Sequence, residues 1–269
     1  MHGWQRVGSR NARFQQWQTL LTNRTKRQRA GRFLVQGVRP ITLAAEQSWP
    51  IRELLIDGDR RLSHWAEDMI ENTAAEVVAL PTDLIAELGE KDQEAAPELV
   101  AVVETPPDDL SRIRLGGGFL GVAFDRPTQP GNVGTLIRSA DAFGASGVIV
   151  TGHAADVYDP RAVRASTGSL FGVPTVRVPS QREVADWLDG TDVTVVGTDE
   201  YGDTDIEDYD FSAPTLIVIG NETVGMSSGW REACDRILRI PMGGIASSLN
   251  AASAGTVVLY EAARQRRRG

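Results

Sequence analysis

The sequence contains little of what disulfide scaffolds and metal centres require. Cys234 is its only cysteine, and its three histidines, His2, His64 and His153, are far apart in the chain. One cysteine forms no disulfide within the chain, and none of these residues stands at the spacing of a zinc site. We therefore expect neither an internal disulfide nor a metal cofactor.

A long apolar run is also missing. The chain has no stretch of about 18 consecutive apolar residues, the length that a membrane-spanning helix needs. The opening sequence, MHGWQRVGSR, lacks the apolar middle region of a secretory signal. We therefore expect no membrane partner and a cytoplasmic location. With 41% hydrophobic and 24% charged residues, the composition is that of a globular protein.

Acidic residues are absent from residues 1–45, although the whole chain has a net charge of -8. That net charge alone disfavours a nucleic-acid partner, because phosphate binding usually needs a basic surface. The acid-free segment changes this interpretation, since it carries basic residues throughout. It is either a solvated basic surface or an RNA-binding one. We predict RNA contacts for five of its basic residues: Arg24, Lys26, Arg27, Arg29 and Arg32.

The pattern of strands and helices divides the chain into two α/β regions. Residues 1–105 alternate strand-like runs with helical patterns and are predicted to be a small α/β domain. Residues 106–118, with adjacent prolines and consecutive glycines, are predicted to be a linker. Residues 119–269 alternate strands and helices, which predicts a mostly parallel sheet covered on both faces. The expected strands are residues 32–35, 51–56, 98–103, 119–124, 147–150, 192–197 and 215–220, and helices are expected from Asn132 and after Leu249.

An acidic segment at residues 199–210 is a candidate for a divalent cation site. It lacks the ligand order and the closing glutamate of a calcium-binding loop. We therefore expect a solvated loop there.

One segment that carries chemistry is FDRPTQPGNVGTLIRSADAFG, residues 124–144. Asn132 is predicted to cap a helix whose apolar residues recur at helical spacing. Arg138 falls off that apolar stripe and is expected to point away from the buried face. In parallel sheets, ligands bind beyond the carboxyl ends of the strands. Asn132 and Arg138 are therefore candidates to line a cleft there, or else they are only a cap and a surface charge.

Two further segments also end strands with polar residues and glycine. In TLIVIGNETVGMS a buried strand runs into Gly220, Asn221 and Glu222, where glycine allows a close approach of the backbone to a ligand. In RIPMGGIASSLNAASAG a short strand leads through a proline and two glycines to Ser248 and Asn250, before a helix rich in small residues. Each signal is weak by itself, and the second is also typical of a serine-rich helix cap.

In order, the three segments resemble the signature motifs of the SpoU (TrmH) family of RNA 2'-O-ribose methyltransferases. The matching motifs are N-x-G-x-x-x-R at residues 132–138, a strand ending in G-N-E at residues 220–222, and I-P-M followed by S-L-N at residues 240–250. The stretch ASTGSLFGVP, residues 165–174, is similar to a further family segment. The resemblance implies a deep trefoil knot in the C-terminal domain and a homodimer with the active site at or near the subunit interface. More loosely, residues 1–105 resemble the ribosomal-protein-like RNA-binding domain of some members.

The resemblance also implies a cofactor, S-adenosylmethionine, and roles for the motif residues. Arg138 would activate the ribose hydroxyl, and Asn132, Glu222, Ser248 and Asn250 would position it and the RNA. A guanidinium, whose pKa exceeds about 12, is a poor base, so activation through an RNA phosphate or simple orientation of the hydroxyl are alternatives. The residues expected to bind the cofactor are Thr198, Gly220, Asn221, Ile240, Met242, Ser248, Leu249 and Asn250.

The expected substrate is RNA, with 23S ribosomal RNA favoured over transfer RNA because of the additional N-terminal domain. Two rival interpretations remain. One is a catalytically silent RNA-binding or assembly factor, which the intact motifs disfavour. The other is an enzyme that methylates a base nitrogen, against which the N-x-G-x-x-x-R and S-L-N motifs count because they indicate ribose.

Overall fold

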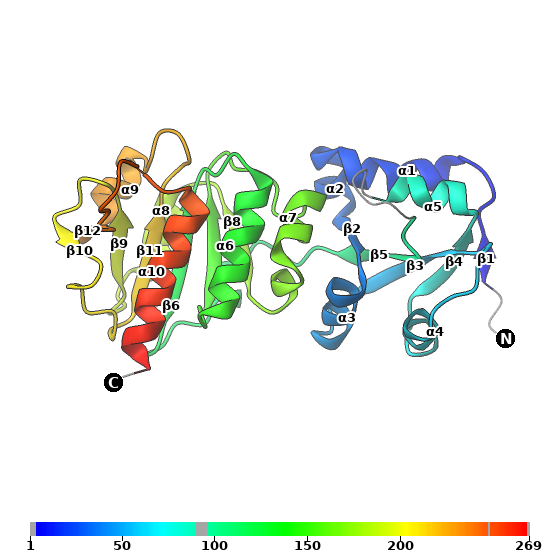
Figure 1. Cartoon of the computed structure of the whole chain (residues 1–269), viewed down its shortest axis with the longest axis horizontal. Helices are drawn as coiled ribbons and strands as arrows, with labels where there is room; N and C mark the ends of the chain where they lie inside the picture. The colour runs from blue at the N-terminus through cyan, green and yellow to red at the C-terminus, as the bar shows by residue number, and fades with distance from the viewer. Residues whose placement is uncertain (1–3, 90–95, 247, 268–269) are drawn as a thin grey trace. The chain divides into compact units, whose positions relative to one another are not determined.

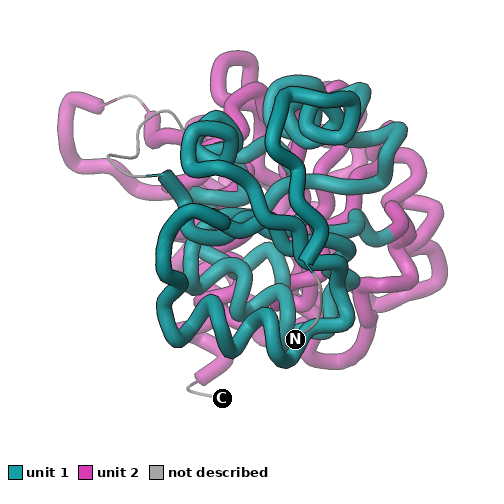
Figure 2. Tube along the Cα trace, turned by 90° about the vertical axis from the view of Figure 1, so that its right-hand side faces the viewer, with its two compact units in different colours: residues 1–106, 158–171 teal, residues 107–157, 172–269 magenta. Residues whose placement is uncertain are grey.

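A computed structural model of the chain describes residues 4–89, 96–246 and 248–267. The chain divides into two compact units (Figure 2). The first comprises Met1–Pro106 together with Tyr158–Phe171, and the second comprises Pro107–Val157 together with Gly172–Gly269. In the part of the chain that the structure describes, no helix is both long and apolar enough to cross a membrane.

The first unit is built on a five-stranded sheet in the order β1-β4-β3-β5-β2. Strand β5 pairs antiparallel with β2 and β3, whereas β4 pairs parallel with β3 and β1. The strands are β1 (Gln5–Arg6), β2 (Arg32–Gln36), β3 (Ile51–Asp57), β4 (Glu76–Leu80) and β5 (Leu99–Glu104). The helices are α1 (Ala12–Thr22), α2 (Arg24–Ala30), α3 (Val38–Glu46), α4 (His64–Glu71), α5 (Thr82–Leu88) and α7 (Pro160–Ser166), followed by the 3-10 turn η2 (Ser169–Phe171).

Side-chain caps begin several of these helices. Asn11 accepts a hydrogen bond from the Phe14 amide at the start of α1, and Asn23 accepts one from the Lys26 amide at the start of α2. The buried faces of α1 and α5 then pack together with one face of the sheet. These contacts form the α/β core of the first unit.

Residues 158–171 belong to the first unit although they lie between two strands of the second sheet in the chain. Aromatic contacts hold them there: the Phe33 ring lies 4.7 Å from the Tyr158 ring and 6.4 Å from the Phe171 ring, measured between centroids. The Trp49 indole also donates a hydrogen bond of 3.1 Å to the Phe171 carbonyl. The sequence pattern did not indicate this grouping.

The second unit is built on a seven-stranded sheet in the order β10-β12-β9-β11-β6-β7-β8. Every strand pairing recorded in it is parallel, as the sequence predicts. The strands are β6 (Leu120–Asp125), β7 (Gly147–Thr151), β8 (Thr175–Val178), β9 (Thr194–Thr198), β10 (Thr204–Asp205), β11 (Thr215–Ile219) and β12 (Arg236–Arg239). The helical elements are η1 (Leu110–Arg112), α6 (Pro130–Ala142), α8 (Gln181–Leu188), α9 (Ser228–Ala233) and α10 (Ala251–Arg266).

Helices cover both faces of the second sheet. Leu216 and Val218 of β11 pack in one cluster with Val184 of α8 and Trp230 of α9. Helices α6 and α10 lie side by side on the opposite face (Figure 1). A Cβ atom on Gly255 of α10 would lie 2.5 Å from Leu136 of α6, so this glycine allows the two helices to approach closely.

The sequence predicts a linker at residues 106–118, of which residues 107–118 group with the second unit. Ile113 is buried in the cluster beneath α8, and the Arg177 guanidinium lies 2.6 Å from the Asp108 carboxylate. This segment is therefore packed against the sheet.

In the basic N-terminal segment, fewer side chains are available to bind RNA than the sequence predicts. Acids from later parts of the same unit pair with several of its arginines, because folding brings residues distant in the chain together. These pairs are Arg6 with Asp59, Arg10 with Glu87, Arg13 with Glu53 and Glu76, and Arg32 with Glu104. Lys26 and Arg29 are exposed, and Arg24 is half-buried.

Arg27 corrects the prediction of RNA contacts directly, because only 3% of it is exposed. Its guanidinium donates to the carbonyls of Leu20 (2.8 Å) and Leu21 (3.1 Å), and it lies 3.7 Å from the carboxylate of Asp159, the N-cap residue of α7. A side chain enclosed in this way holds helices together and is not available to a phosphate.

We expect Arg27→Ala to lower the free energy of unfolding by about 3 kcal/mol, because it leaves two carbonyls without their buried donor and removes the charge that pairs with Asp159. Arg29→Ala, on the exposed side of the same helix, should change it by less than about 0.5 kcal/mol. Urea unfolding followed by circular dichroism measures both. Equal stability of the two variants would contradict the structural role of Arg27.

Candidate active site

A pocket of about 540 Å³ lies at the carboxyl ends of the neighbouring strands β12, β9 and β11. This is the edge at which parallel sheets bind ligands. The lining includes seven of the residues predicted to bind the cofactor: Thr198, Gly220, Asn221, Ile240, Met242, Ser248 and Leu249. Asn250, the eighth, does not line the pocket but follows Leu249 as the N-cap residue of α10.

The loop after β11 forms one wall of the pocket as a tight backbone turn. The amides and carbonyls of Asn221 and Gly225 exchange two hydrogen bonds of 3.1 Å. The Asn221 side-chain carbonyl accepts from the amides of Thr223 (2.9 Å) and Val224 (3.1 Å). Gly225 has a φ of 68°, which favours glycine. The turn therefore presents a rigid backbone to the pocket.

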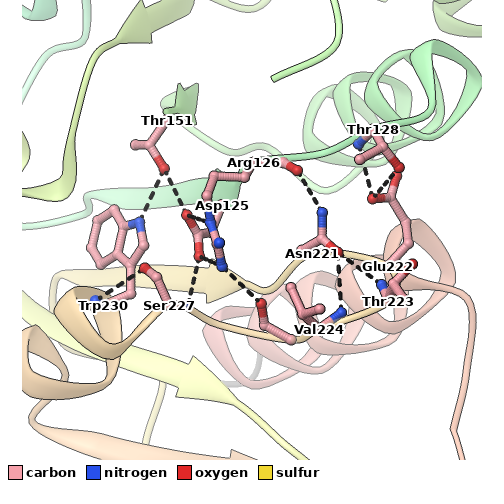
Figure 3. Close-up of polar contacts among 11 residues, drawn as sticks. Asp125, Arg126, Thr128, Thr151, Asn221, Glu222, Thr223, Val224, Ser227 and Trp230 are labelled. Atoms are coloured by element: carbon pink, nitrogen blue, oxygen red, sulfur yellow. Dashed lines mark hydrogen bonds and ion pairs between the residues drawn. The ribbon is translucent and has the colours of Figure 1, made fainter. Parts of the chain in front are cut away.

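Asp125, at the end of β6, fixes the far end of this turn (Figure 3). Only 2% of Asp125 is exposed, and its carboxylate accepts a hydrogen bond of 2.7 Å from the Ser227 amide. It also accepts from Thr151 (3.4 Å) and pairs with the Arg126 guanidinium at 3.1 Å. The Trp230 indole donates to the same Thr151 hydroxyl at 3.0 Å.

Arg126 fixes the near end of the turn with its backbone. Its carbonyl accepts a hydrogen bond of 2.7 Å from the Asn221 side-chain amide (Figure 3). Arg126 has a φ of 50°, in the left-handed region that non-glycine residues rarely adopt. Strain of this kind persists only where surrounding contacts impose it and is frequent at functional sites. Asp125 and Arg126 together therefore hold both ends of the turn from outside the pocket.

We expect Asp125→Asn to lower the free energy of unfolding by about 2 kcal/mol and to weaken binding of the expected cofactor, because the charged acceptor for Ser227 and Arg126 is lost. Asp186→Asn is the matched control, since Asp186 is exposed on α8 of the same unit and does not line the pocket. Thermal unfolding and calorimetric titration of the cofactor measure the two effects. Unchanged cofactor affinity in a folded Asp125→Asn protein would show that the turn needs no such anchor.

Glu222 uses both carboxylate oxygens at the start of α6. It accepts from the amides of Thr128 (2.9 Å) and Gln129 (3.1 Å), and from the Asn132 side chain (3.0 Å). Helix α6 begins at Pro130, and its N-cap residue, Gln129, makes no side-chain cap. A carboxylate at a helix N-terminus also interacts favourably with the helix dipole. Glu222 thus serves as the cap from another segment of the chain.

This geometry corrects the prediction that Asn132 caps the helix. Pro130 occupies the first helical position, where proline is favoured, so Asn132 falls inside the first turn. Its side-chain amide donates to Glu222, and its side-chain carbonyl accepts from Asn250 at 3.2 Å. Asn250 in turn accepts from the Ser253 amide. Three residues from the three predicted motifs, Glu222, Asn132 and Asn250, therefore form one hydrogen-bonded chain.

Burial tends to raise the pKa of Glu222, but the hydrogen bonds from Thr128, Asn132 and Gln129 outweigh it, so its pKa is lowered from the ordinary 4.5. A carboxylate with a lowered pKa in the folded state stabilises the fold fully above the unfolded value and loses that contribution as the pH falls through the folded value. We therefore expect the difference in Tm between the wild type and Glu222→Gln to be constant above pH 4.5 and to shrink below it. A difference that grows on acidification would contradict this assignment.

Arg138 does not line the pocket of its own chain. It lies on the exposed side of α6, six residues beyond Asn132, which corresponds to about 9 Å along the helix axis. The next residue, Ser139, faces α10 and lies 2.7 Å from the Thr256 hydroxyl. The prediction that Arg138 points away from the buried face is confirmed, whereas within one chain the structure does not bring it to the pocket with the other motif residues.

The pocket also contains residues that sequence reasoning did not assign to it. Asp199, Glu200 and Tyr201 line it, although the segment that begins at Asp199 is predicted to be a solvated loop. Asp199 pairs with Arg231 of α9, which also lines the pocket. Their position in the sequence could have indicated this, since they directly follow β9 and so lie at the carboxyl edge of the sheet. Among the residues that the structure describes, no group of three or more His, Cys, Asp or Glu is arranged to hold a metal ion.

The fold and the pocket define an α/β protein with a ligand site at the carboxyl edge of a parallel sheet, joined to a smaller α/β unit. The sequence profile of the SpoU rRNA Methylase family matches residues 120–260, and that of the SpoU L30e-like domain matches residues 11–101. The chain belongs to the SpoU rRNA methylase family.

Individual relatives agree with this assignment over nearly the whole chain. A 23S rRNA (uridine(2479)-2'-O)-methyltransferase of Streptomyces viridochromogenes is 62% identical over 266 residues, covering 97% of this chain and 92% of that protein. The crystal structure of the SpoU methyltransferase AviRb from Streptomyces viridochromogenes in complex with AdoMet has a TM-score of 0.93 at 62% identity, covering 97% of this chain and 100% of that one. An AdoMet-bound rRNA methyltransferase from Sinorhizobium meliloti has a TM-score of 0.86 at 29% identity, covering 97% of each chain.

Proposed function

We propose that this protein transfers the methyl group of S-adenosylmethionine to a ribose 2'-hydroxyl of 23S ribosomal RNA. The observation that carries the proposal is the 62% identity, over almost the full length of both chains, to a 23S rRNA uridine 2'-O-methyltransferase. A pocket lined by seven of the residues predicted to bind the cofactor supports it. Because its proposed substrate is ribosomal RNA, we also propose a cytoplasmic location.

The chemistry of the pocket fits S-adenosylmethionine. Asp199 and Glu200 provide carboxylates on one side, which suit the ligand's positive charge, and the backbone turn after Gly220 provides peptide groups. Ile219, Ile240 and Leu249 provide apolar contacts for a purine ring. When bound, the cofactor supplies an activated methyl group. The protein then has to exclude water and align the ribose oxygen, which itself lowers the barrier considerably.

We also propose a homodimer that covers the outer faces of α6 and α10. On α10 the large side chains of Val257 and Tyr260 are 36% and 49% exposed, and the Tyr260 ring contacts Phe143, which ends α6. Apolar groups exposed in a row along a helix are typical of an interface. Arg138 lies on the exposed side of α6, so a second copy seated there would place Arg138 at or near the subunit interface. Its proposed role is to orient or activate the ribose hydroxyl.

Transfer of a labelled methyl group from S-adenosylmethionine to purified RNA tests the proposed substrate. We expect incorporation into 23S rRNA and not into 16S rRNA or transfer RNA. Incorporation into transfer RNA alone would replace the proposed substrate. Tight binding of 23S rRNA without transfer to any RNA would instead support a catalytically silent RNA-binding factor.

A further inference from the structure

The first unit contains a pocket of its own, with a volume of about 290 Å³. The end of β2 and the start of α3 form one side of it. Pro160, Val163 and Arg164 of α7 and its C-cap residue, Thr167, form the other. The volume is near the lower end of small-molecule sites, which begin at about 300 Å³. A single nucleotide is the size of ligand that such a site accepts.

Gln36, in the lining at the end of β2, has a buried acceptor without a partner. Its side-chain amide nitrogen donates to the Leu88 carbonyl at 2.7 Å, which fixes the orientation of the group. Its Oε1 atom is buried and accepts no hydrogen bond within the described part of the chain. Buried acceptors are nearly always satisfied, and an exception requires an explanation. A ligand that donates a hydrogen bond to Oε1 would provide one.

The other polar groups of this pocket suit an anion. Arg39 and Arg164 line it and are exposed to solvent, and none of the described residues in the lining is acidic. Helix α3 begins here at Val38. Its N-cap residue, Gly37, has a φ of 91° and offers no side-chain cap to the first two amides, those of Val38 and Arg39. The third residue, Pro40, has no amide hydrogen. Uncapped amides at a helix N-terminus are a favourable site for a phosphate.

We propose that this pocket binds one unstacked nucleotide of the RNA substrate. The phosphate contacts Arg39, Arg164 and the first amides of α3, and an amino, imino or hydroxyl group of the nucleotide donates to Gln36 Oε1. Leu34, Pro40 and Val163 contact the base or sugar. Such a mixture of phosphate, edge and apolar contacts is how proteins bind single-stranded RNA. The inference rests on the proposed function in that it takes ribosomal RNA as the substrate.

Binding of 23S rRNA to the full-length protein, without the methyl donor, tests the pocket directly. We expect Arg39→Ala and Arg164→Ala each to weaken binding about tenfold, and each to reduce the slope of log affinity against log salt by about one phosphate contact. Gln36→Leu should weaken binding without changing that slope. Arg61→Ala is the charge-matched control, because Arg61 is exposed in the same unit and does not line the pocket.

The outcomes separate this inference from the proposed function. Methyl transfer with normal RNA affinity and salt slope in Arg39→Ala and Arg164→Ala would overturn the nucleotide pocket and leave the function intact. RNA binding that depends on the pocket residues, without methyl transfer by the wild type, would overturn the proposed function and leave the nucleotide pocket intact. Absence of 23S rRNA binding by the wild type would overturn the pocket as proposed. Thermal unfolding measures whether Gln36→Leu is folded. If that variant is unfolded, Arg39→Ala and Arg164→Ala decide whether the pocket binds RNA.

Discussion

Arg138→Ala should lower the rate of methyl transfer by about a hundredfold or more while leaving the affinity for S-adenosylhomocysteine unchanged. The size is typical for loss of a positioning or acid-base group. Arg138 is exposed, off the apolar stripe of α6 and outside the pocket lining, so the fold and the cofactor site should survive its removal. Calorimetry and a labelled-methyl assay on 23S rRNA measure the two effects separately.

Arg182→Ala is the matched control for Arg138→Ala, because Arg182 is an exposed arginine on α8, outside the pocket lining. It should transfer methyl groups at the wild-type rate. Near-normal transfer by a folded Arg138→Ala protein would remove Arg138 from the mechanism. Proton removal would then be left to solvent or to the RNA.

The second large effect is expected at Gly220. A Cβ atom there would lie 2.4 Å from the Met226 amide nitrogen and 2.5 Å from the Gly225 carbonyl carbon, and both are backbone atoms. Gly220→Ala must therefore displace the turn that forms one wall of the pocket. We expect cofactor affinity to fall about a hundredfold, which corresponds to about 2.8 kcal/mol, and turnover to fall with it.

Gly131→Ala is the control for this substitution. Gly131 lies in the first turn of α6, and a Cβ atom there would have no neighbour within 4 Å. Its cofactor affinity should match that of the wild type. Wild-type affinity in Gly220→Ala as well would show that the turn tolerates displacement, and hence that it is not the rigid wall described above.

The two variants also test whether a second copy completes the site. If Arg138 acts in the pocket of the partner subunit, a mixed dimer of Arg138→Ala and Gly220→Ala subunits contains one intact site. When the two variants are mixed in equal amounts and their subunits exchange randomly, half of the dimers are mixed, and each mixed dimer has one intact site of two. Activity should then return to about a quarter of the wild-type value. No recovery in mixed dimers would place Arg138 and the pocket of one chain in the same site.

The sequence predicted the parallel sheet well, because its strands are short apolar runs that alternate with helical patterns. The cofactor residues after β9, β11 and β12 were expected from the resemblance to the SpoU family. The structure brings seven of them together, because the carboxyl ends of parallel strands meet at one edge. Residues whose role depends on distant contacts were predicted less well. Asn132 has the chemistry of a cap, yet Pro130 moves the helix start and Glu222 takes over the capping.

The basic N-terminal segment shows the same limit. Charge along the chain predicts a surface, but the acids that pair with Arg10, Arg13 and Arg32 come from residues about 40 or more positions away in the sequence. Arg27 is buried and pairs with Asp159, the N-cap residue of α7, and no local pattern connects α7 with α2. Long-range pairing of this kind is set by topology, and single-sequence periodicity contains no signal for it.

Methyl transfer to ribose in 23S rRNA is tested most directly by the chemical identity of the product. Purified protein, S-adenosylmethionine and unmodified 23S rRNA should give an RNA whose complete nuclease digest contains one new methylated nucleoside. Mass spectrometry should place the additional methyl group on the ribose. A methyl group on a base, or no new methylated nucleoside although the folded protein binds the cofactor, would contradict the account.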